Sequence, residues 1–451
     1  MTDTTKTIDP NLASGFKDYL PADMIPRQFM FDTVRNVFEN FGFVPLDTPG
    51  LEKEDVLTGG DPDSSKKIYR AGLPAGGEKM ALRFDLTVPL ARFIAGNPDL
   101  KKPFKRYQTG KVWRGEKPQA GRYREFVQFD VDIVGSTSML ADAEIIAIMN
   151  ATMPALGIKN FLVRVNNRKI LNGLAEYAGF LPDKNEAVLR TIDKLDKQGW
   201  DKVEAELCND AINPEDTIGL TPDQANAIKK FIDLRAGTPT ETLDAVEKLM
   251  SKSPVALEGI SELREIATAV KAMGVPDEKW KVDLSVARGL GYYTGPVFET
   301  VLTDILEIGS VFSGGRYNGL IARYGAPSTP ATGASLGVDR LFAALTKLGL
   351  VKQSESVSKV VVLCLGEAVQ NSCLEIVSDI RKSGVPAEIF FDATKSIRDQ
   401  LGYTSGKAIP LAVIIGSDEA TRKVAKLKDM RNGKQEEIAI SELVSRIKEL
   451  I

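Results

Sequence analysis

The sequence predicts an α/β protein built from three parts, and three observations carry that prediction. Residues 81–90 and 122–134 alternate polar and apolar side chains, as strands of an antiparallel sheet do. Residues 168–280 are rich in Lys, Glu, Asp, Leu and Ala at helical spacing. Residues 358–451 alternate strand-like and helix-like segments, which is typical of a partly parallel sheet covered by helices. The expected parts are an α+β part with an antiparallel sheet (1–167 and 281–350), a helical insertion (168–280) and a C-terminal α/β part (358–451).

The composition is that of an ordinary globular protein, but it excludes several kinds of chemistry. Of the 451 residues, 43% are hydrophobic and 26% are charged. The chain contains no histidine, which excludes Ser-His-Asp and Cys-His catalysis, HExxH zinc sites and any imidazole general base. An enzyme with this composition would act through positioning and fixed charges, with carboxylates, arginines and the groups of its own substrate.

The three cysteines, Cys208, Cys364 and Cys373, are scattered and form no CxxC pair. This arrangement argues against a disulfide framework or a thiolate metal site and favours small buried thiols in a reducing compartment. No apolar run approaches the roughly 20 residues of a membrane-spanning helix, and the polar start lacks the features of a signal peptide. We therefore expect a cytoplasmic protein without a membrane segment. Because the net charge is −3, any contact with nucleic acid must come from local basic patches.

A helix and a broken strand are expected near the N-terminus. Apolar residues in 27–41 recur at helical spacing, and Gly42 follows where the helix would end. The next residues, 43–51, favour a strand that two prolines, Pro45 and Pro49, interrupt.

Two further strands each combine an apolar face with a polar one. In 81–90 the polar face carries Arg83, Asp85 and Thr87. In 122–134 it is formed by the even-numbered residues Arg122, Arg124, Phe126, Gln128, Asp130, Asp132 and Val134. A solvated outer face of a sheet would explain this pattern. The absence of lysine from both polar faces favours a binding face instead, because binding faces prefer the rigid fork of arginine.

A charged hairpin is expected in residues 111–128. A Pro-Gln-Ala-Gly loop separates its two arms, whose charged residues include Lys111, Arg114, Glu116, Lys117, Arg122 and Arg124. The planar guanidinium of arginine suits phosphate oxygens, so a triphosphate is the expected ligand, and the loop could reach a second, larger substrate. The alternative is a surface hairpin whose ion pairs contribute little to stability.

The segment ARGLGYYTGPVFE (287–299) spaces its glycines one residue further apart than the dinucleotide fingerprint does. It also leads into a strand-like run where that fingerprint demands a helix, so a dinucleotide site is rejected. A buried pair of tyrosines, Tyr292 and Tyr293, beside Arg288 would suit a small polar ligand. The alternative is that both tyrosines belong to the hydrophobic core.

Two glycine-rich segments follow. SVFSGGRYNG (310–319) is expected to form a turn, and GASLGVDRLF (333–342) a strand that runs into a helix. Its small residues would let a flat ring approach the backbone closely. Arg340 lies near the expected start of the helix and could meet a phosphate there, helped by the helix dipole. The alternative is tight packing of the strand against the helix.

Taken together in this order, these segments resemble a class II aminoacyl-tRNA synthetase. Residues 42–52 are similar to motif 1 of that class, 113–134 to motif 2 and 333–340 to motif 3. LRFDLTVP (82–89) and RGLGYY (288–293) resemble the two signatures of the histidyl-tRNA synthetases, and GRYREFVQFDVDIVG follows that family's motif 2. The resemblance covers nearly the whole chain, including a helical insertion and a C-terminal α/β anticodon-binding domain.

The resemblance implies a histidine–tRNA ligase. Such an enzyme activates L-histidine with ATP to histidyl-adenylate and releases pyrophosphate. It then transfers histidine to the 3′ end of tRNA(His) and releases AMP. The implied partners are ATP with Mg²⁺, histidine, tRNA(His) and a second copy of the chain, since motif 1 builds a dimer interface in this class. No dedicated set of metal ligands is visible in the sequence.

The resemblance also implies a role for each matched residue. The residues expected to bind ATP are Arg114, Glu116, Arg122 and Arg340. Arg288 and Arg114 are the expected catalytic residues, with Arg288 acting on the α-phosphate while the histidine carboxylate attacks. The residues expected to bind histidine are Asp85, Thr87, Gln128, Asp132, Tyr292 and Tyr293. Among these, Asp85 would take the α-amino group with Thr87 beside it, and Gln128 would hold the carboxylate region. Asp132 and Tyr293 would read the imidazole.

Three positions depart from the family pattern. Gly115 and Val127 stand where many members have histidine, and Gly291 stands where RGLDYY has aspartate. The first two flank the site and would change how the loop meets the acceptor end of the tRNA. The third puts in doubt any role for a carboxylate at that position.

A regulatory paralogue of the synthetases, which is catalytically silent and controls histidine biosynthesis, is the alternative. Such proteins usually lack the C-terminal domain and lose the signature arginines. This chain keeps Arg114, Arg288 and Arg340, and its basic stretch 422–434 would suit an anticodon stem. These features favour the ligase.

Overall fold

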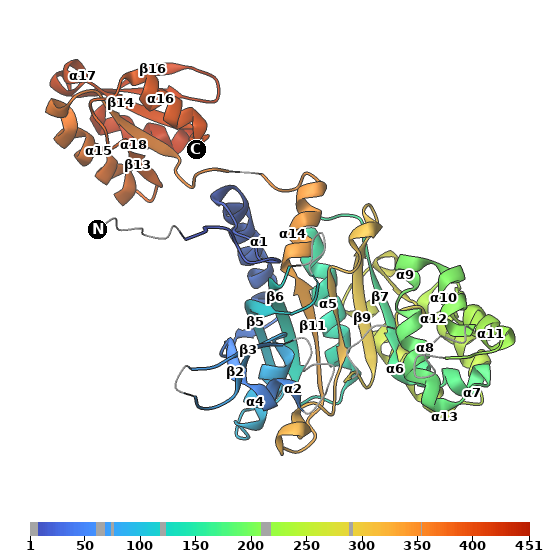
Figure 1. Cartoon of the computed structure of the whole chain (residues 1–451). Coiled ribbons are helices and arrows are strands. Elements are labelled where there is room, and N and C mark those ends of the chain that lie inside the picture. The colour runs from blue at the N-terminus through green and yellow to red at the C-terminus, as the bar shows by residue number, and fades with distance from the viewer. Residues whose placement is uncertain are drawn as a thin grey trace. The chain divides into compact units, whose positions relative to one another are not determined.

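The computed structural model describes residues 8–59, 68–73, 76–117, 123–208, 218–287, 292–352 and 354–451. The chain divides into two compact units, one formed by residues 1–17 and 32–350 and the other by 18–31 and 351–451 (Figure 1). Within the described ranges, no helix is long and apolar enough to cross a membrane.

The first unit is organised around an eight-stranded sheet in the order β1-β5-β6-β11-β10-β9-β7-β8 (Figure 1). Its pairings are antiparallel except for β1 with β5 and β7 with β8. The predicted α+β part with an antiparallel sheet is therefore confirmed. The strands are β1 (Val44–Pro45), β5 (Phe104–Trp113), β6 (Glu125–Val134), β7 (Phe161–Asn167), β8 (Trp280–Val282), β9 (Pro296–Leu302), β10 (Phe312–Arg316) and β11 (Ala331–Gly337).

One face of this sheet is apolar and is covered by helices. The odd-numbered residues of β6 point to this face, and Phe129 is 1% exposed there. The ring of Phe38, from α1 (Pro21–Asn40), lies 5.1 Å from that of Phe129 and 6.3 Å from that of Phe312. Helix α5 (Met139–Ala155) packs against the same sheet. The opposite face is thereby left for polar side chains.

The prediction of a strand over residues 81–90 is wrong except for its first two residues. Strand β4 (Met80–Leu82) ends early, and helix α4 (Thr87–Ala95) begins five residues later. The Asp85 carboxylate accepts a hydrogen bond from the Val88 N–H at 3.0 Å, which satisfies a donor that the first turn of a helix leaves free. An alternating pattern this short occurs both in strands and in loops that lead into a helix, so it does not distinguish the two.

The expected strand over residues 43–51 is likewise divided between two sheets. Its start forms β1 at the edge of the large sheet, where Pro45 needs no ladder partner for its nitrogen. Its end enters β2 (Leu51–Lys53), which pairs with β4 in a three-stranded sheet completed by β3 (Tyr69–Ala71). Helix α2 (Glu54–Thr58) follows β2.

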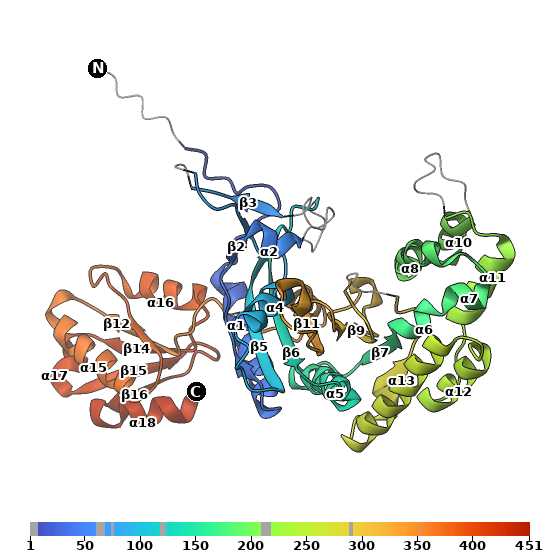
Figure 2. The same ribbon diagram turned by 90° about the horizontal axis from the view of Figure 1, so that it is seen from below.

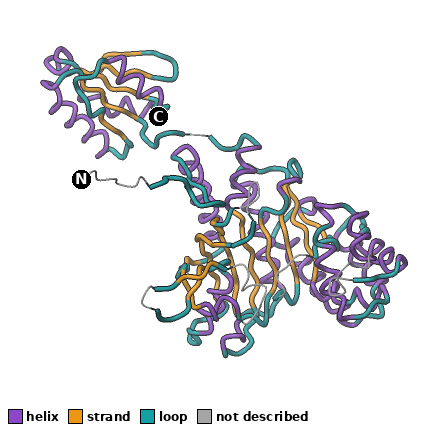
Figure 3. Tube along the Cα trace, in the orientation of Figure 1, coloured by secondary structure: helices purple, strands orange, loops and turns teal. Residues whose placement is uncertain are grey.

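The described residues between β7 and β8 form helices joined by loops, without a strand, as predicted (Figures 2 and 3). Helices α11 and α12 each begin with a threonine and a proline, and Thr221 and Thr238 form capping boxes that satisfy free N–H groups. The helices are α6 (Arg168–Asn172), α7 (Leu174–Ala178), α8 (Asn185–Ile192), α9 (Leu195–Gln198), α10 (Trp200–Cys208), α11 (Pro222–Ile232), α12 (Pro239–Leu249) and α13 (Pro254–Ala272).

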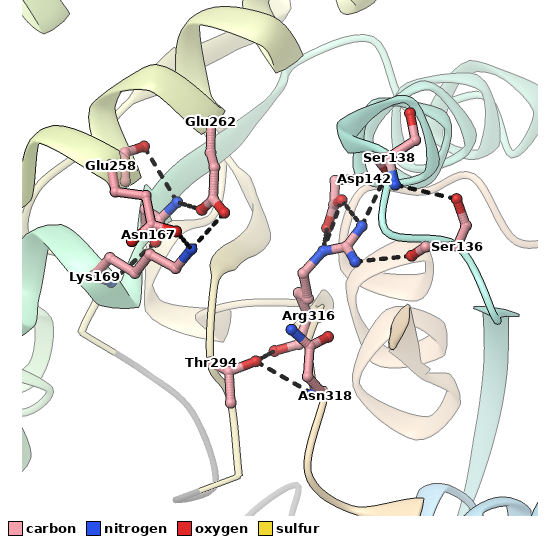
Figure 4. Close-up of polar contacts among 11 residues, drawn as sticks. Ser136, Ser138, Asp142, Asn167, Lys169, Glu258, Glu262, Thr294, Arg316 and Asn318 are labelled. Atoms are coloured by element: carbon pink, nitrogen blue, oxygen red, sulfur yellow. Dashed lines mark hydrogen bonds and ion pairs between the residues drawn. The ribbon is translucent and has the colours of Figure 1, made fainter. Parts of the chain in front are cut away.

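Polar contacts tie this helical segment to the end of β7 (Figure 4). The Asn167 amide donates to the Gly259 carbonyl at 3.2 Å and to Glu262 at 2.7 Å, both on α13. Lys169 Nζ lies 2.6 Å from a carboxylate oxygen of Glu258 and of Glu262. Strand β7 therefore holds α13 directly, which fixes the helical segment beside the sheet.

The second unit contains a five-stranded sheet in the order β13-β12-β14-β15-β16. Strands β12 (Val360–Cys364), β13 (Ala387–Ile389) and β14 (Leu411–Ile415) are parallel, which confirms the predicted partly parallel α/β sheet. The antiparallel pair β15 (Val424–Asp429) and β16 (Gln435–Ala439) was not predicted. The helices are α15 (Gln370–Lys382), α16 (Ile397–Gly406), α17 (Ser417–Arg422) and α18 (Ile440–Leu450).

Candidate functional site

The polar face of the large sheet is a buried floor and not a solvated surface. Gln128, Asp130 and Asp132 of β6 are 8%, 2% and 3% exposed. In register, β11 places Gly337, Ser335 and Gly333 beside them, and β5 places Gly110, Gln108 and Arg106 on the other side. The interpretation as an exposed outer face is therefore wrong, and the alternating pattern belongs to an enclosed site.

Glycines give the acidic side chains of this floor their space. A Cβ at Gly333 would lie 1.9 Å from Asp132 Oδ1, and one at Gly314 would lie 2.0 Å from the Gly333 carbonyl oxygen. The turn expected over residues 310–319 is corrected here, because Phe312–Arg316 forms strand β10. Its glycines allow close approach within the sheet and do not mark a change of direction.

A cavity of about 370 Å³ opens on this floor, and we call it the acidic pocket. It contains all six residues expected to bind histidine and also Arg114. Its lining is Asp85, Thr87, Arg114, Gln128, Asp130, Asp132, Asp193, Val286, Tyr292, Tyr293, Val297, Phe298, Ser313, Gly314, Tyr317, Gly333, Ala334 and Ser335. Its size lies within the roughly 300–1,000 Å³ of small-molecule sites.

Asp132 is held in place by a buried cation and a buried phenol. Arg106 is completely buried, and its Nη2 lies 2.7 Å from Asp132 Oδ2. The Tyr317 hydroxyl donates to Asp132 Oδ1 at 2.6 Å. Arg106 also donates to the Leu86 carbonyl at 3.3 Å, just before helix α4. This carboxylate therefore has a fixed orientation at one end of the acidic pocket.

The two tyrosines form one wall of the pocket and are half-buried. Their rings lie 4.9 Å apart at 61°, and a hydrogen bond joins Tyr292 to Thr87. The next residue, Thr294, is anchored to β10: its N–H donates to the Arg316 carbonyl at 2.9 Å, and its Oγ1 accepts from the Asn318 N–H at 3.2 Å (Figure 4).

Arg316 is fixed in turn from the other face of the sheet (Figure 4). Its guanidinium pairs with the buried Asp142 of α5 and donates to the carbonyls of Ser136 and Ser138 at 2.9 and 3.0 Å. Removing one partner of such a buried pair typically costs about 3–5 kcal/mol. The tyrosine segment thus rests on a rigid support.

The described residues of this pocket carry more negative than positive charge. Burial raises the pKa of Asp85 to about 6 and that of Asp130 to about 7, and it raises the pKa of Asp132 as well. Arg106 opposes each of these shifts, but it faces three carboxylates. A cationic ligand would relieve this imbalance.

A second cavity of about 380 Å³ adjoins the first, and we call it the arginine pocket. It shares Arg114, Gln128, Ser313 and Ser335 with the acidic pocket. Its lining is Arg114, Glu116, Lys117, Tyr123, Phe126, Val127, Gln128, Ser310, Val311, Ser313, Ser335, Gly337, Asp339 and Arg340. The arrangement suits a flat ring together with a phosphate group.

The arginines of this second pocket are positioned by backbone carbonyls. Arg114 Nε donates to the Phe84 carbonyl at 3.0 Å, and its guanidinium lies 5.0 Å from the centre of the Phe126 ring. Arg340, in the first turn of α14 (Val338–Lys347), donates to the Ser310 carbonyl at 2.5 Å. The expected strand running into a helix, with Arg340 near its start, is confirmed.

The structure brings together Arg114, Glu116 and Arg340 from the residues expected to bind ATP. Arg122 and Arg288 lie outside the described residues, as does Gly291. Val127 contributes its backbone N–H, which donates to the Asp339 carboxylate at 3.0 Å. This hydrogen bond uses the backbone, so it does not depend on whether residue 127 is valine or histidine.

Several of the residues that line the acidic pocket were not predicted from the sequence. Asp130 already stood on the polar face of the predicted strand, so its alternation with Gln128 and Asp132 was an available signal. Ser335 and Tyr317 depend on the register between distant strands, which no local pattern reveals. Asp193 follows helix α8, so the helical segment contributes to the acidic pocket.

A third cavity of about 1010 Å³ lies between β7, β9 and the helical segment. One of its cations, Arg164, is already paired: it lies 2.9 Å from Asp283, 2.8 Å from Asp196 and 3.1 Å from Glu299. Among the described residues, no group of three or more His, Cys, Asp or Glu side chains is arranged to hold a metal ion. The two smaller pockets are therefore the candidate site.

Comparisons with known proteins agree with this geometry. The family model for histidyl-tRNA synthetase matches residues 15–341, and that for an anticodon binding domain matches 359–450. A histidine–tRNA ligase of Wolinella succinogenes is 42% identical over 95% of both chains, and one of Rhodopirellula baltica is 40% identical over 96% of both.

Solved structures point the same way. A histidyl-tRNA synthetase from Nostoc sp. PCC 7120 superposes with a TM-score of 0.86 at 34% identity, covering 99% of this chain and 100% of the other. An ATP phosphoribosyltransferase regulatory subunit/histidyl-tRNA synthetase from Bacillus halodurans superposes at 0.73 with 20% identity over 91% of this chain. That second likeness shows the fold alone and does not favour the regulatory alternative. The chain belongs to the histidyl-tRNA synthetase family.

Proposed function

We propose that the protein is a histidine–tRNA ligase. It activates L-histidine with ATP to histidyl-adenylate, releases pyrophosphate, and then transfers histidine to the 3′ end of tRNA(His) with release of AMP. One observation carries the proposal: a pocket lined by buried acceptors adjoins a pocket lined by arginines, and the two share Arg114 and Gln128. An amino acid in the first and ATP in the second would meet at the shared residues.

The acidic pocket supplies what histidine requires. Imidazole presents two ring nitrogens, so the Asp132 carboxylate and the Tyr293 phenol would pair with both. Asp85 would accept from the α-amino group, with Thr87 and Tyr292 beside it. A wrong amino acid would offer no N–H to the buried Asp132, and a missing polar partner of this kind gives strong discrimination.

The arginine pocket suits the activation of a carboxylate by ATP. Arg114 and Arg340 would hold phosphates, with Glu116 nearby and Phe126 available to the base. Displacement at the α-phosphate develops charge on its oxygens, which fixed guanidinium groups stabilise without proton transfer. Arg122 and Arg288 would join them. No general base is needed, because the attacking carboxylate is already ionised, and this fits a chain without histidine.

Magnesium is expected to enter with ATP, which carries phosphate oxygens as ligands. Glu116, a carboxylate that lines the arginine pocket, would fit this ion. When bound, the ion would neutralise charge on the leaving pyrophosphate.

We further propose that residues 1–167 with 281–350 form the catalytic domain, 168–280 an inserted helical domain, and 358–451 the anticodon-binding domain. The helices between β7 and β8 support the first two, and the match over 359–450 supports the third. A dimer is expected through residues 42–52, where Val44 is 48% exposed at the sheet edge. Three unpaired thiols fit the reducing cytoplasm.

Amino-acid-dependent ATP–pyrophosphate exchange tests this proposal. The purified full chain would be assayed with each of the twenty amino acids in turn, followed by charging of tRNA(His) with histidine. Exchange that depends on histidine alone, and then charging, is the expected result.

Other outcomes of the same assay decide against the proposal in separate ways. Exchange with another amino acid would keep the ligase chemistry and overturn the specificity. Histidine binding without exchange would instead support the regulatory paralogue.

A further inference from the structure

Four buried acceptor atoms in the acidic pocket receive no hydrogen bond from a described donor: Asp85 Oδ2, Gln128 Oε1, Asp130 Oδ1 and Asp132 Oδ2. The last of these forms an ion pair with Arg106 at 2.7 Å, and the other three are open. The three residues are 2%, 8% and 2% exposed, and all of them line the same cavity. A buried acceptor without a partner costs free energy. The three atoms therefore point to a ligand that supplies several N–H donors at once.

Each of these side chains is oriented by its other polar atom. The second carboxylate oxygen of Asp85 accepts from the Val88 N–H at 3.0 Å. Gln128 Nε2 donates to Ser335 Oγ at 2.6 Å, and Ser335 forms a hydrogen bond with Asp130. In each case one end of the group is fixed by the protein, and the remaining oxygen is left open.

Asp132 differs from these three residues. Its Oδ1 accepts from Tyr317, and its Oδ2 is paired with Arg106. The carboxylate expected to read the imidazole thus already has a hydrogen bond at one oxygen and an ion pair at the other. Asp130, one step along the same face of β6, presents the open oxygen.

We propose that Asp130 binds the α-ammonium group of the substrate, together with Asp85 and Gln128. This inference rests on the proposed function and adds a residue to which neither the sequence pattern nor the family resemblance gave a role. An ammonium group carries three N–H donors, which matches the three open acceptors in number. A neutral imidazole carries one N–H and cannot satisfy all three.

The charge around Asp130 favours the same occupant. Asp130 lies beside two other carboxylates, and Arg106 is the guanidinium that faces it across the pocket floor. A bound ammonium would bring the local charge closer to balance and form charge-assisted hydrogen bonds. The groups that face Asp130 are Arg106 and Gln108 of β5, Gln128 and Asp132 of β6, Ser335 of β11, Asp85 before α4, and Tyr293.

The variant Asp130→Asn tests the inference because it keeps the shape of the side chain and removes its charge. Binding of three probes to the full chain would be measured by calorimetry. Histidine has both the ammonium and the imidazole, histamine lacks the carboxylate, and 3-(imidazol-4-yl)propionate lacks the ammonium. Comparing probes across variants isolates the contact between Asp130 and the ammonium.

The expected result is a selective loss. Histidine and histamine should bind about 10- to 100-fold more weakly to Asp130→Asn, the range for a hydrogen bond between charged groups. The affinity for 3-(imidazol-4-yl)propionate should be unchanged. In the exchange assay the KM for histidine should rise by the same factor, while the KM for ATP and kcat stay the same.

Asp142→Asn is the matched control, because Asp142 is as buried as Asp130 but pairs with Arg316 outside the acidic pocket. It should lower stability and leave the ratio of the probe affinities unchanged. Asp130→Ser would replace Asp130→Asn if the latter failed to fold. Equal weakening of all three probes, or no weakening of any, would overturn the inference while leaving histidine activation intact. A wild-type protein that does not bind histidine would overturn both proposals.

Discussion

Strands β6 and β15 show the same polar–apolar alternation but have opposite surroundings. In β15, Lys426 and Lys428 are half-exposed while Ala425 and Leu427 are buried, which is the usual solvated face. In β6 the polar residues Gln128 to Asp132 are as buried as the apolar ones between them. Alternation alone therefore does not distinguish a surface from a site. The residue types do, because β15 has lysine at its polar positions and β6 has none.

The ionic partners of the two strands differ in the same way. Around β15 the cations are matched by acids: Arg422 lies 2.7 Å from Glu437, Lys426 lies 2.5 Å from Glu419, and Arg431 lies 2.8 Å from Asp429. The cations of these pairs are half-exposed or exposed, and ion pairs that water reaches contribute little to stability. On β6, one buried arginine, Arg106, faces both Asp130 and Asp132. The remaining negative charge is shielded from solvent and would favour a cationic ligand.

Asp132→Ala should have the largest effect on the polar face of β6. It removes the acceptor of Tyr317 and Arg106 and the expected partner of the imidazole. We expect kcat/KM for histidine in the exchange assay to fall about 10⁴-fold, the scale on which a missing polar partner discriminates. Lys428→Ala, the control on β15, should leave the exchange unchanged. If kcat/KM fell no further for Asp132→Ala than for the control, the polar face of β6 would not be a binding site.

Arg106→Met should have the next largest effect, on folding rather than catalysis. The substitution leaves Asp132 buried without its cation, so the free energy of unfolding should fall by about 3–5 kcal/mol in urea denaturation. The loss should be smaller in acid, because burial already raises the pKa of Asp132 and a proton can replace the missing charge.

Lys426→Met on β15 provides the comparison for Arg106→Met. Lys426 is half-exposed, and its partner Glu419 keeps a hydrogen bond from the Gly416 N–H at 2.9 Å, so the free energy of unfolding should fall by much less. Equal destabilisation by the two substitutions would show that the buried pair on β6 has no special role.

The smallest expected effect is on the pH dependence of stability without ligand. The folded-state pKa values of Asp85 and Asp130 are about 6 and about 7, above their ordinary value. The folded protein then holds protons that the unfolded chain has lost, so its stability should fall as pH rises from about 4 to 7. Asp130→Asn should remove part of this fall in thermal unfolding midpoints measured across that range. Identical slopes for wild type and variant would contradict the assignment of the shift to Asp130.

The sequence predicts those parts of the fold in which apolar residues dominate locally. Strands β12 and β14 are short apolar runs, and the capped helices α11 and α12 carry their own start signals. The β15–β16 hairpin was missed although Asn432 and Gly433 give its turn a strong hairpin signal, because residues 422–434 were interpreted only as a basic stretch. The strand predicted over residues 81–90 was wrong because the start of a helix and a strand can show the same short pattern.

The candidate site follows the same rule. The six residues expected to bind histidine were found through motifs, and the structure gathers all six around one cavity. Arg106, Tyr317 and Asp193 are distant in sequence, and only strand register and the packing of the helical segment bring them there. Their contribution depends on tertiary structure, which the order of residues does not display.

A crystal structure of the protein with histidine bound would test the central claim most directly. The polar face of β6 should carry the amino acid, with its α-ammonium nitrogen within hydrogen-bonding distance of Asp85, Gln128 and Asp130 and its imidazole beside Asp132. Histidine bound elsewhere, or with its ammonium turned away from these three acceptors, would contradict the account.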